Sequence, residues 1–183
     1  DKGVFVGTNV ADPARPYFTS ETGEITLDGG RDLMILDTKR TAGGYAQVAQ
    51  TIRTRDGSVS ITIAGSDATV WVSSLDAQPI SRSRRLLVTH LTDLQNSGIR
   101  YAEPARQTLS DWGGLPHLVR AGRAAIEINL EKAKRYKVWA LSTSGRRLAE
   151  VKSEVQGKIL QFTADVAADP PGGARMLYEI SRR

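Results

Sequence analysis

The residues of this 183-residue chain that could do chemistry are its acids, two histidines and a few aromatic side chains. Glu21, Glu24, Asp28, Asp32 and Asp37 cluster in sequence, and a glycosidase needs two carboxylates across one sugar-binding cleft. Asp28 and Asp32, however, flank a glycine turn, where aspartate commonly bonds its own backbone. The spacing also lacks the full loop signature of a calcium site. We therefore predict a turn role for Asp28 and no metal.

Nucleophilic catalysis would need a serine, a histidine and an orienting acid in one place. His90 shares a predicted strand face with Leu86 and Val88, which favours a hydrogen-bonded histidine in the core. The chain has no cysteine, no Gly-x-Ser-x-Gly elbow, no Walker loop and no Gly-x-Gly-x-x-Gly. The sequence therefore predicts no catalytic centre and no cofactor, and we expect a chain that is not itself an enzyme.

Aromatic side chains that stack on sugar rings are a further possibility. Trp71 alternates with valines on a predicted strand, which puts it on the less apolar face, and Trp139 alternates in the same way. Packing in a core or a domain interface is the commoner use of such residues, and aromatics make up only 6% of the chain. Trp71, Tyr101 and Trp139 are our candidates for a carbohydrate-binding surface. We expect Trp112 to plug a loop.

The charge is unevenly distributed along the chain. Residues 1–81 carry 7 Lys/Arg against 10 Asp/Glu, whereas residues 82–183 carry 18 against 10, so the net charges are −3 and +8. The basic residues are dispersed, and the arginines of Ser81-Arg82-Ser83-Arg84-Arg85 alternate between two faces with no stacking platform beside them. We expect no nucleic-acid partner. A polyanion binder is kept as an alternative.

Period-two alternation of apolar and polar residues dominates the sequence and is typical of half-buried strands. Glycine turns such as Asp56-Gly57 and Ser144-Gly145 separate the segments. The predicted strands are residues 24–27, 33–38, 45–52, 59–63, 69–75, 85–91, 124–130, 136–141, 147–155, 160–166 and 176–180. Many short strands with one apolar face each predict an all-β fold, an antiparallel β-sandwich of the jelly-roll or immunoglobulin-like kind.

The organisation along the chain is simple. We predict a single domain over residues 1–183, with a soft boundary near 118–122 and a smaller sub-sandwich after it. Only residues 130–136 have helix-forming composition, and seven residues predict a turn or short helix between strands. No apolar run approaches the roughly 20 residues that span a bilayer, so we expect no membrane insertion.

Several stretches in serial order resemble a known family. They are residues 20–28 (SETGEITLD), 36–40 (LDTKR), 73–80 (SSLDAQPI), 83–87 (SRRLL), 96–99 (NSGI) and 112–116 (WGGLP). Together they resemble the C-terminal β-sandwich region of large bacterial glycoside hydrolases with a TIM-barrel catalytic domain, of the cellulase, mannanase and β-galactosidase type. The resemblance covers roughly residues 15 to 180. Glu21 stands where the pattern has Asp, Leu27 where it has Trp, and Ser97-Gly98-Ile99 where it has Thr-Gly-Met.

This resemblance implies a non-catalytic accessory region of a secreted polysaccharide-acting enzyme, found outside the cell or in the periplasm. Its partners would be the catalytic barrel, which carries both catalytic glutamates, and a polysaccharide. The shared motifs also have structural explanations: Asp37 and Arg40 are close enough to pair, and Asp76 can build the corner between two strands. The rivals are a carbohydrate-binding module and an independent hydrolase.

Overall fold

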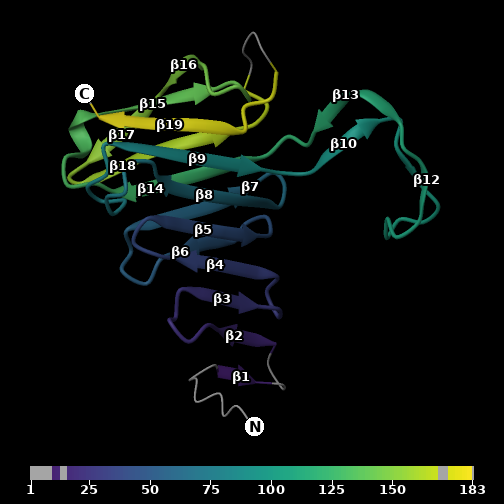
Figure 1. Cartoon of the computed structure of the whole chain (residues 1–183), viewed down its shortest axis with the longest axis horizontal. Coiled ribbons are helices and arrows are strands. Elements are labelled where there is room, and N and C mark those ends of the chain that lie inside the picture. The colour runs from purple at the N-terminus through teal and green to yellow at the C-terminus, as the bar shows by residue number, and fades with distance from the viewer. Residues whose placement is uncertain (1–9, 13–15, 169–172, 183) are drawn as a thin grey trace.

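The computed structural model describes residues 10–12, 16–168 and 173–182, which form two main antiparallel sheets (Figure 1). The ten-stranded sheet has the order β1 (Val10–Asp12), β2 (Tyr17–Thr19), β3 (Ile25–Asp28), β4 (Leu33–Asp37), β5 (Thr41–Ala46), β8 (Ala68–Ser74), β9 (Arg85–Leu91), β19 (Leu177–Arg182), β15 (Tyr136–Leu141), β16 (Arg147–Val151). The five-stranded sheet has the order β17 (Ser153–Gln156), β18 (Ile159–Asp165), β14 (Arg123–Asn129), β7 (Val59–Ala64), β6 (Thr51–Arg53).

The two sheets pack face to face around one core, which confirms the predicted all-β sandwich. Burial alternates residue by residue along β14, as a strand with one inward face requires. Val70 and Val72 of the larger sheet and Ile61 and Ile126 of the smaller one are almost completely buried in this core. Large aromatics contribute as well, for example Tyr178, which is 1% exposed. Burial of these apolar faces supplies the main driving force for the fold.

The strands after Gly122 belong to the same two sheets as the strands before it. β14 pairs with β7, and β19 pairs with β9, so there is no separate C-terminal sub-sandwich. Each late strand completes an apolar layer that an early strand began. The predicted short helix is present as a 3-10 turn at Ala133–Arg135. Among the described residues, no helix is long and apolar enough to cross a membrane.

Two predicted strands were too long. The segment 45–52 is divided between β5 and β6, and the segment 147–155 between β16 and β17. In both cases the chain leaves one sheet and enters the other. Between β16 and β17 the side-chain alternation continues across the bend, so periodicity could not reveal the change of sheet. Between β5 and β6 a turn at Val48 and Ala49, with Ala49 at a φ of 67°, interrupts the alternation.

The larger sheet extends well past the smaller one (Figure 1). The smaller sheet reaches β4 and β5 through its edge strand β6, while β1, β2 and β3 continue as a single layer. Gly43 and Gly44 of β5 lie where this extension joins the sandwich. A Cβ atom at Gly43 would lie 2.0 Å from the Val70 carbonyl oxygen, and one at Gly44 would lie 1.7 Å from that of Met34. Only glycine permits this close strand pairing.

An arm leaves the sandwich between β9 and β14 (Figure 1). It consists of two small hairpins, β10 (Leu94–Ser97) with β13 (Gly114–Val119) and β11 (Arg100–Tyr101) with β12 (Leu109–Asp111). These four strands were not predicted, because the arm has little period-two pattern. Asp93 at the base of the arm accepts hydrogen bonds from Arg106 at 2.9 Å and Arg120 at 3.1 Å. These two ion pairs tie the distal loop back to the base.

Candidate docking surface

The sandwich has two outer faces, and the strand register identifies the residues on each. Directly paired residues share a face, so the rows can be followed from strand to strand. On the five-stranded sheet the outward side chains are mostly polar and hydrogen-bonded to one another. Thr51 and Thr62 lie 3.0 Å apart, and Gln161 donates to Glu127 at 3.0 Å. This composition is that of a solvated surface.

The outer face of the ten-stranded sheet is apolar over much of its width. Two rows of directly paired residues cross it: Phe18, Leu27, Met34, Tyr45, Thr69, Leu91 and, beside them, Ile25, Leu36, Gly43, Trp71, Thr89, Leu177, Leu141. No outward-facing side chain in β2, β3, β4, β5 or β8 is charged. Phe18 is 46% exposed and Leu27 43% exposed. A contiguous exposed apolar face of this kind marks an interaction site.

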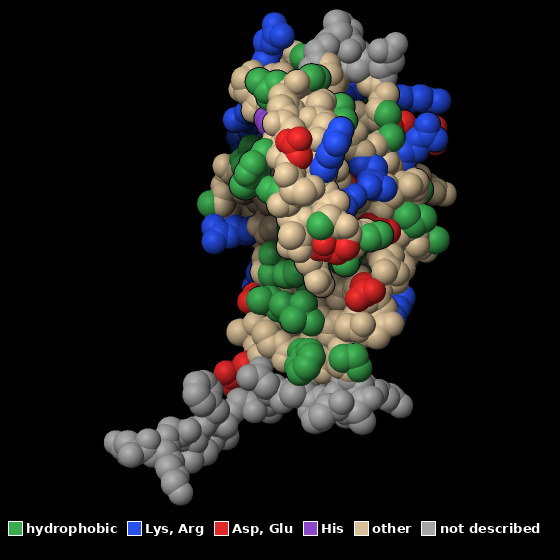
Figure 2. Space-filling model, turned by 90° about the vertical axis from the view of Figure 1, so that its right-hand side faces the viewer, with side chains coloured by type: hydrophobic (Ala, Val, Ile, Leu, Met, Phe, Trp, Pro, Cys, Tyr) green, Lys and Arg blue, Asp and Glu red, His purple; other side chains and the backbone are tan. Residues whose placement is uncertain are grey.

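The reverse side of the single layer has a different composition. Thr19, Thr26 and Asp28 point to that side, with Tyr17 as its exposed aromatic. The extension is thus amphipathic although neither of its sides is covered by the smaller sheet. In Figure 2 the Lys and Arg side chains lie mainly on the upper part of the molecule, and hydrophobic side chains are prominent lower down, towards the N-terminal strands. This distribution agrees with the uneven charge along the sequence.

Among the described side chains, charge appears on this face only at the corner formed by β9, β19, β15 and β16. Glu179, which is 4% exposed, accepts hydrogen bonds from Arg85 Nε and Arg147 Nε, each at 2.5 Å. Arg147 also donates to Ser181 Oγ at 3.0 Å. Burial by itself would raise the pKa of Glu179, but the hydrogen bonds and charges of the two arginines outweigh it and lower the pKa. The carboxyl group is therefore held ionised beneath the arginines.

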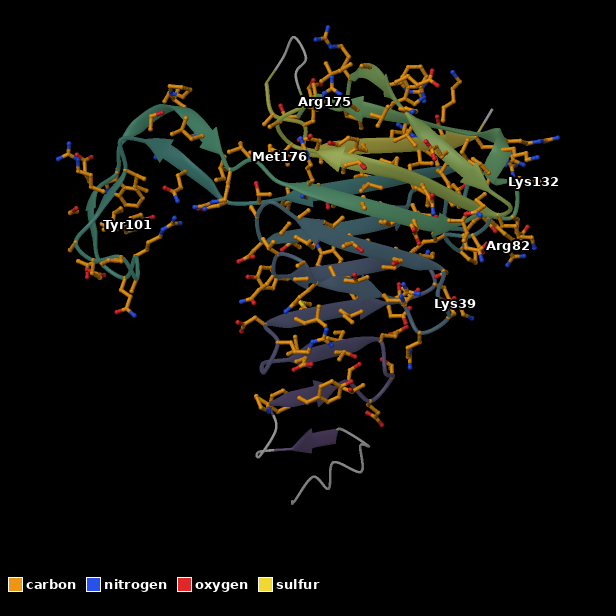
Figure 3. All side chains as sticks on the ribbon, turned by 180° about the vertical axis from the view of Figure 1, so that it is seen from behind. Lys39, Arg82, Tyr101, Lys132, Arg175 and Met176 are labelled. Atoms are coloured by element: carbon orange, nitrogen blue, oxygen red, sulfur yellow. The ribbon has the colours of Figure 1, made fainter. Side chains whose placement is uncertain are left out.

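Two of the three aromatic residues predicted to bind carbohydrate lie on this same outer face. Trp71 is in β8 and Trp139 in β15, three strand positions apart, which corresponds to roughly 14 Å. Both are half-buried. The Arg147 guanidinium carbon lies 5.0 Å from the centre of the Trp139 ring. Tyr101 is on the arm, away from both sheets (Figure 3). The structure therefore brings Trp71 and Trp139 to one surface and separates Tyr101 from them.

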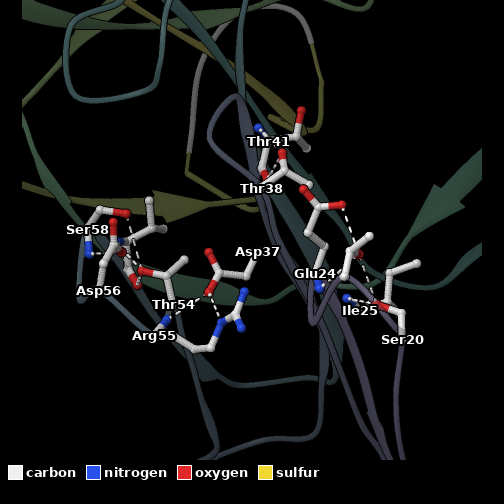
Figure 4. Close-up of polar contacts among 12 residues, drawn as sticks. Ser20, Glu24, Ile25, Asp37, Thr38, Thr41, Thr54, Arg55, Asp56 and Ser58 are labelled. Atoms are coloured by element: carbon white, nitrogen blue, oxygen red, sulfur yellow. Dashed lines mark hydrogen bonds and ion pairs between the residues drawn. The ribbon is translucent and has the colours of Figure 1, made fainter. Parts of the chain in front are cut away.

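The predicted corner acids have structural partners, with one change. Asp76 builds the connection from β8 to β9, as predicted: it accepts hydrogen bonds from Arg84 N at 2.6 Å and Ser74 Oγ at 3.0 Å. Burial acts to raise its pKa, but hydrogen bonds from the Arg84 backbone and from nearby serines lower the pKa to about 2. The predicted partner of Asp37 was wrong. Asp37 binds Arg55 instead of Arg40, accepting from its backbone N at 2.8 Å (Figure 4).

The difference at Asp37 has a simple geometric cause. The Arg55 backbone comes within reach because β6 leads the chain back past the end of β4. Arg40 follows Asp37 closely in sequence, but its backbone N donates to Thr38 Oγ1 in a local turn. Asp28 ends β3, and its carbonyl oxygen accepts a hydrogen bond from Arg31 N at 3.2 Å, which is the predicted turn position.

The arm exposes large apolar side chains. Trp112 is 75% exposed and Leu115 79% exposed, and more than half of Leu94 and Leu118 is also exposed. The expectation that Trp112 plugs a loop was wrong. The short hairpins leave no interior into which the indole could fold, and the Trp112 carbonyl oxygen instead accepts a hydrogen bond from Asn96. The arm is thus a second surface with unpartnered apolar groups.

His90 lies in the core, as predicted, with no exposed surface. Neither of its ring nitrogens makes a hydrogen bond of good geometry, and an interaction with the Ala164 backbone is all that remains of the expected bond. Burial lowers its pKa to about 4, against the opposing charge of Asp165.

Among the described residues, no three His, Asp or Glu side chains gather as a metal site would require. A groove of about 480 Å³ lies open on the outer side of β14, β17 and β18.

Sequence reasoning missed the apolar outer face and the Arg85–Glu179–Arg147 cluster. A signal for the first was present in Leu33-Met34-Ile35-Leu36, an unbroken apolar run that indicates a strand covered on both sides. The second had no local signal, because its three members come from strands far apart in sequence.

In a comparison with known proteins, no family model, curated protein or solved structure matches the chain.

Proposed function

We propose that this chain is a non-catalytic accessory domain of a polysaccharide-acting glycoside hydrolase that works outside the cytoplasm. In this proposal the outer face of the ten-stranded sheet packs against the catalytic TIM-barrel domain and supports it. The serial motifs that resemble such accessory regions suggest the parent enzyme. The carrying observation is the contrast between the two outer faces, since only the larger sheet presents an uncharged apolar surface.

The physical reason is the cost of leaving that surface in water. Exposed apolar area is unfavourable by roughly 25 cal/mol per Å². Phe18, Ile25 and Leu27 are large, exposed and adjacent in the register, and no strand of the smaller sheet lies over them. A folded neighbour would remove them from water. It would also give the single layer of β1 to β3 the second layer that an independently stable sheet needs.

The arm supplies a second contact in this proposal. Trp112, Leu115 and Leu118 are exposed along the arm, and an exposed tryptophan such as Trp112 often anchors a protein interface. The ion pairs of Asp93 hold the arm in a defined shape, which reduces the entropy lost when a partner binds.

The test uses the complete protein encoded by the reading frame. Phe18→Ser combined with Leu27→Ser should lower the Tm of the complete protein clearly more than it lowers the Tm of the chain expressed alone. Ile159→Ser is the matched control, because Ile159 is a similarly exposed apolar residue on the polar face. Equal effects of the two variants in both proteins would refute docking through this face. A reading frame without a catalytic barrel would refute the parentage.

A carbohydrate-binding module is the second candidate, favoured by the presence of Trp71 and Trp139 on one surface. It predicts that the isolated chain is retarded in gels containing a neutral polysaccharide such as glucomannan, and that Trp71→Ala abolishes the retardation. Unchanged mobility across a panel of neutral polysaccharides would count against it.

A further inference from the structure

The geometry points to a binding site for an acidic saccharide at the charged corner of the outer face. We propose that Arg85 and Arg147 bind an oxyanion carried by the sugar, a carboxylate or a sulfate, beside Trp139. This inference rests on the proposed function, since it names the class of polysaccharide that such a domain would meet. The docking surface itself lies on the same outer face, towards the opposite end of the sheet, where β2 to β5 are located.

The first argument is the orientation of the two guanidinium groups. Each uses its Nε to donate to the buried carboxylate of Glu179, and Arg147 Nη2 also donates to Ser181 Oγ, so both Nη groups of Arg85 and Nη1 of Arg147 are the donors left for a ligand. The arginine side chains are 61% and 48% exposed, whereas the Glu179 side chain is 5% exposed. The carboxylate therefore acts as an anchor from below. A planar guanidinium held in this way recognises carboxylate or sulfate oxygens from above.

The second argument is charge balance. Two arginines share one carboxylate, which leaves the cluster with a net charge of +1. The neighbouring Lys137 is neutralised by its own ion pair with Glu150. An anionic ligand would balance the remaining charge at a place where half-buried side chains reduce screening by solvent.

The third argument is the surface beside the cluster. Trp139 supports the Arg147 guanidinium, and the rows between this corner and Trp71 contain the uncharged Leu87 and Thr89. The two tryptophans are three strands apart, roughly 14 Å across the sheet, and are offset by two residues along the strands. Fixed cations beside uncharged side chains suit an extended chain that combines apolar ring faces with periodic negative charge.

The experiment is affinity electrophoresis of the folded chain at 0.15 M ionic strength, about the physiological value. The probes are polygalacturonate for carboxylate, dextran sulfate for sulfate, and unmodified dextran as the neutral reference. Arg147→Gln and Arg85→Gln should each weaken retardation by the charged polymer about tenfold. Arg147→Lys should weaken it nearly as much, because lysine keeps the charge but lacks the planar fork.

Arg123→Gln is the matched control. Arg123 is also an exposed arginine paired with one carboxylate, Asp165, but it lies on the polar face of the sandwich. Unchanged binding by this variant, with loss in the corner variants, would support the site. Equal loss in Arg123→Gln, full binding by Arg147→Lys, or no retardation by either charged polymer would overturn it. Circular dichroism and thermal unfolding confirm that each variant remains folded.

The two polymers distinguish the source of the oxyanion. Retardation by polygalacturonate alone assigns a uronate ligand, and retardation by dextran sulfate alone assigns a sulfated one. A failure here is separate from a failure of the proposed function, which is measured through Phe18 and Leu27 in the complete protein. If those variants still destabilise the complete protein, only the saccharide site is lost.

Discussion

The two outer faces of the sandwich have the same architecture and opposite chemistry. On the five-stranded sheet, outward Thr62 hydrogen-bonds Thr51, and Gln161 donates to Glu127. On the ten-stranded sheet, the outward positions hold Phe18, Leu27 and the residues in register with them. Both sheets bury an apolar inner face, so the core alone does not require this difference. The difference is the basis of the proposal that the larger sheet docks against a partner.

The comparison also separates two kinds of exposed residue. A single exposed leucine is ordinary in soluble proteins and needs no explanation. The apolar residues of the larger sheet are different because they are consecutive in register across several strands and contain no outward charge from β2 to β8. Their arrangement, more than their individual exposure, indicates a docking surface.

The largest expected effect comes from a substitution that interrupts the sheet carrying the apolar face. Gly44→Ala places a Cβ 1.7 Å from the Met34 carbonyl oxygen, so β4 and β5 cannot stay paired. We expect loss of more than about 4 kcal/mol of stability, or failure to fold. Urea unfolding measures the loss. The control is Gly114→Ala, whose Cβ would meet nothing within 4 Å. A Gly44→Ala variant as stable as the wild type would show that the pairing at this junction is wrong.

The next prediction concerns the core that both sheets share, and it is tested through the pH dependence of stability. The pKa of His90 is near 4 in the folded state and 6.5 in the unfolded state, so the unfolded chain binds more protons between these values. Protonation of His90 in the unfolded chain therefore leaves the free energy of unfolding unaffected above pH 6.5. It lowers the free energy of unfolding by about 3 kcal/mol as the pH drops to 4. His90→Gln should flatten this fall in urea unfolding at pH 7, 5.5 and 4. His117→Gln, on the arm, should leave it unchanged. The same slope in His90→Gln would contradict the assignment.

A smaller loss of stability is expected at the charged corner, where a buried ion pair can be compared with an exposed one on the same face. Glu179→Leu leaves Arg85 and Arg147 without their buried partner and should cost about 2 kcal/mol. The exposed pair of Lys137 and Glu150 is the comparison, since Glu150→Gln should cost less than about 0.5 kcal/mol. Because the pKa of Glu179 is lowered by folding, the difference between Glu179→Leu and wild type should shrink as the pH falls below about 4.5. A constant difference would show that Glu179 acts by packing alone.

The finest test transfers the chemistry of one face to the other. Ala125→Leu with Thr163→Ile builds an apolar pair at directly paired, outward positions of the five-stranded sheet. Stability should change by less than about 0.5 kcal/mol, because these are surface substitutions. Binding of a hydrophobic dye such as 8-anilinonaphthalene-1-sulfonate should increase. Conversely, Phe18→Ser with Leu27→Ser should decrease dye binding. No change in either direction would mean that the apolar face is not accessible in solution.

Part of the fold of this protein could be predicted from its sequence alone. The all-β class, the strands 85–91 and 136–141, and the turn around Asp76 follow from alternation and from residues that form local turns. These features depend on neighbours only a few positions apart. His90 was placed in the core for the same reason, because strand periodicity assigns it the same side as Leu86 and Val88.

Only the tertiary structure revealed which outer face is apolar and which residues share it. Alternation separates two sides of a strand, but it does not say which neighbouring strands extend each side. The row from Phe18 to Tyr45, the shared surface of Trp71 and Trp139, and the partner of Asp37 all depend on pairing between distant segments. Glu179 is 94 residues from Arg85 and meets it only because β19 pairs with β9. Such long-range register is set by the packing of the whole sandwich.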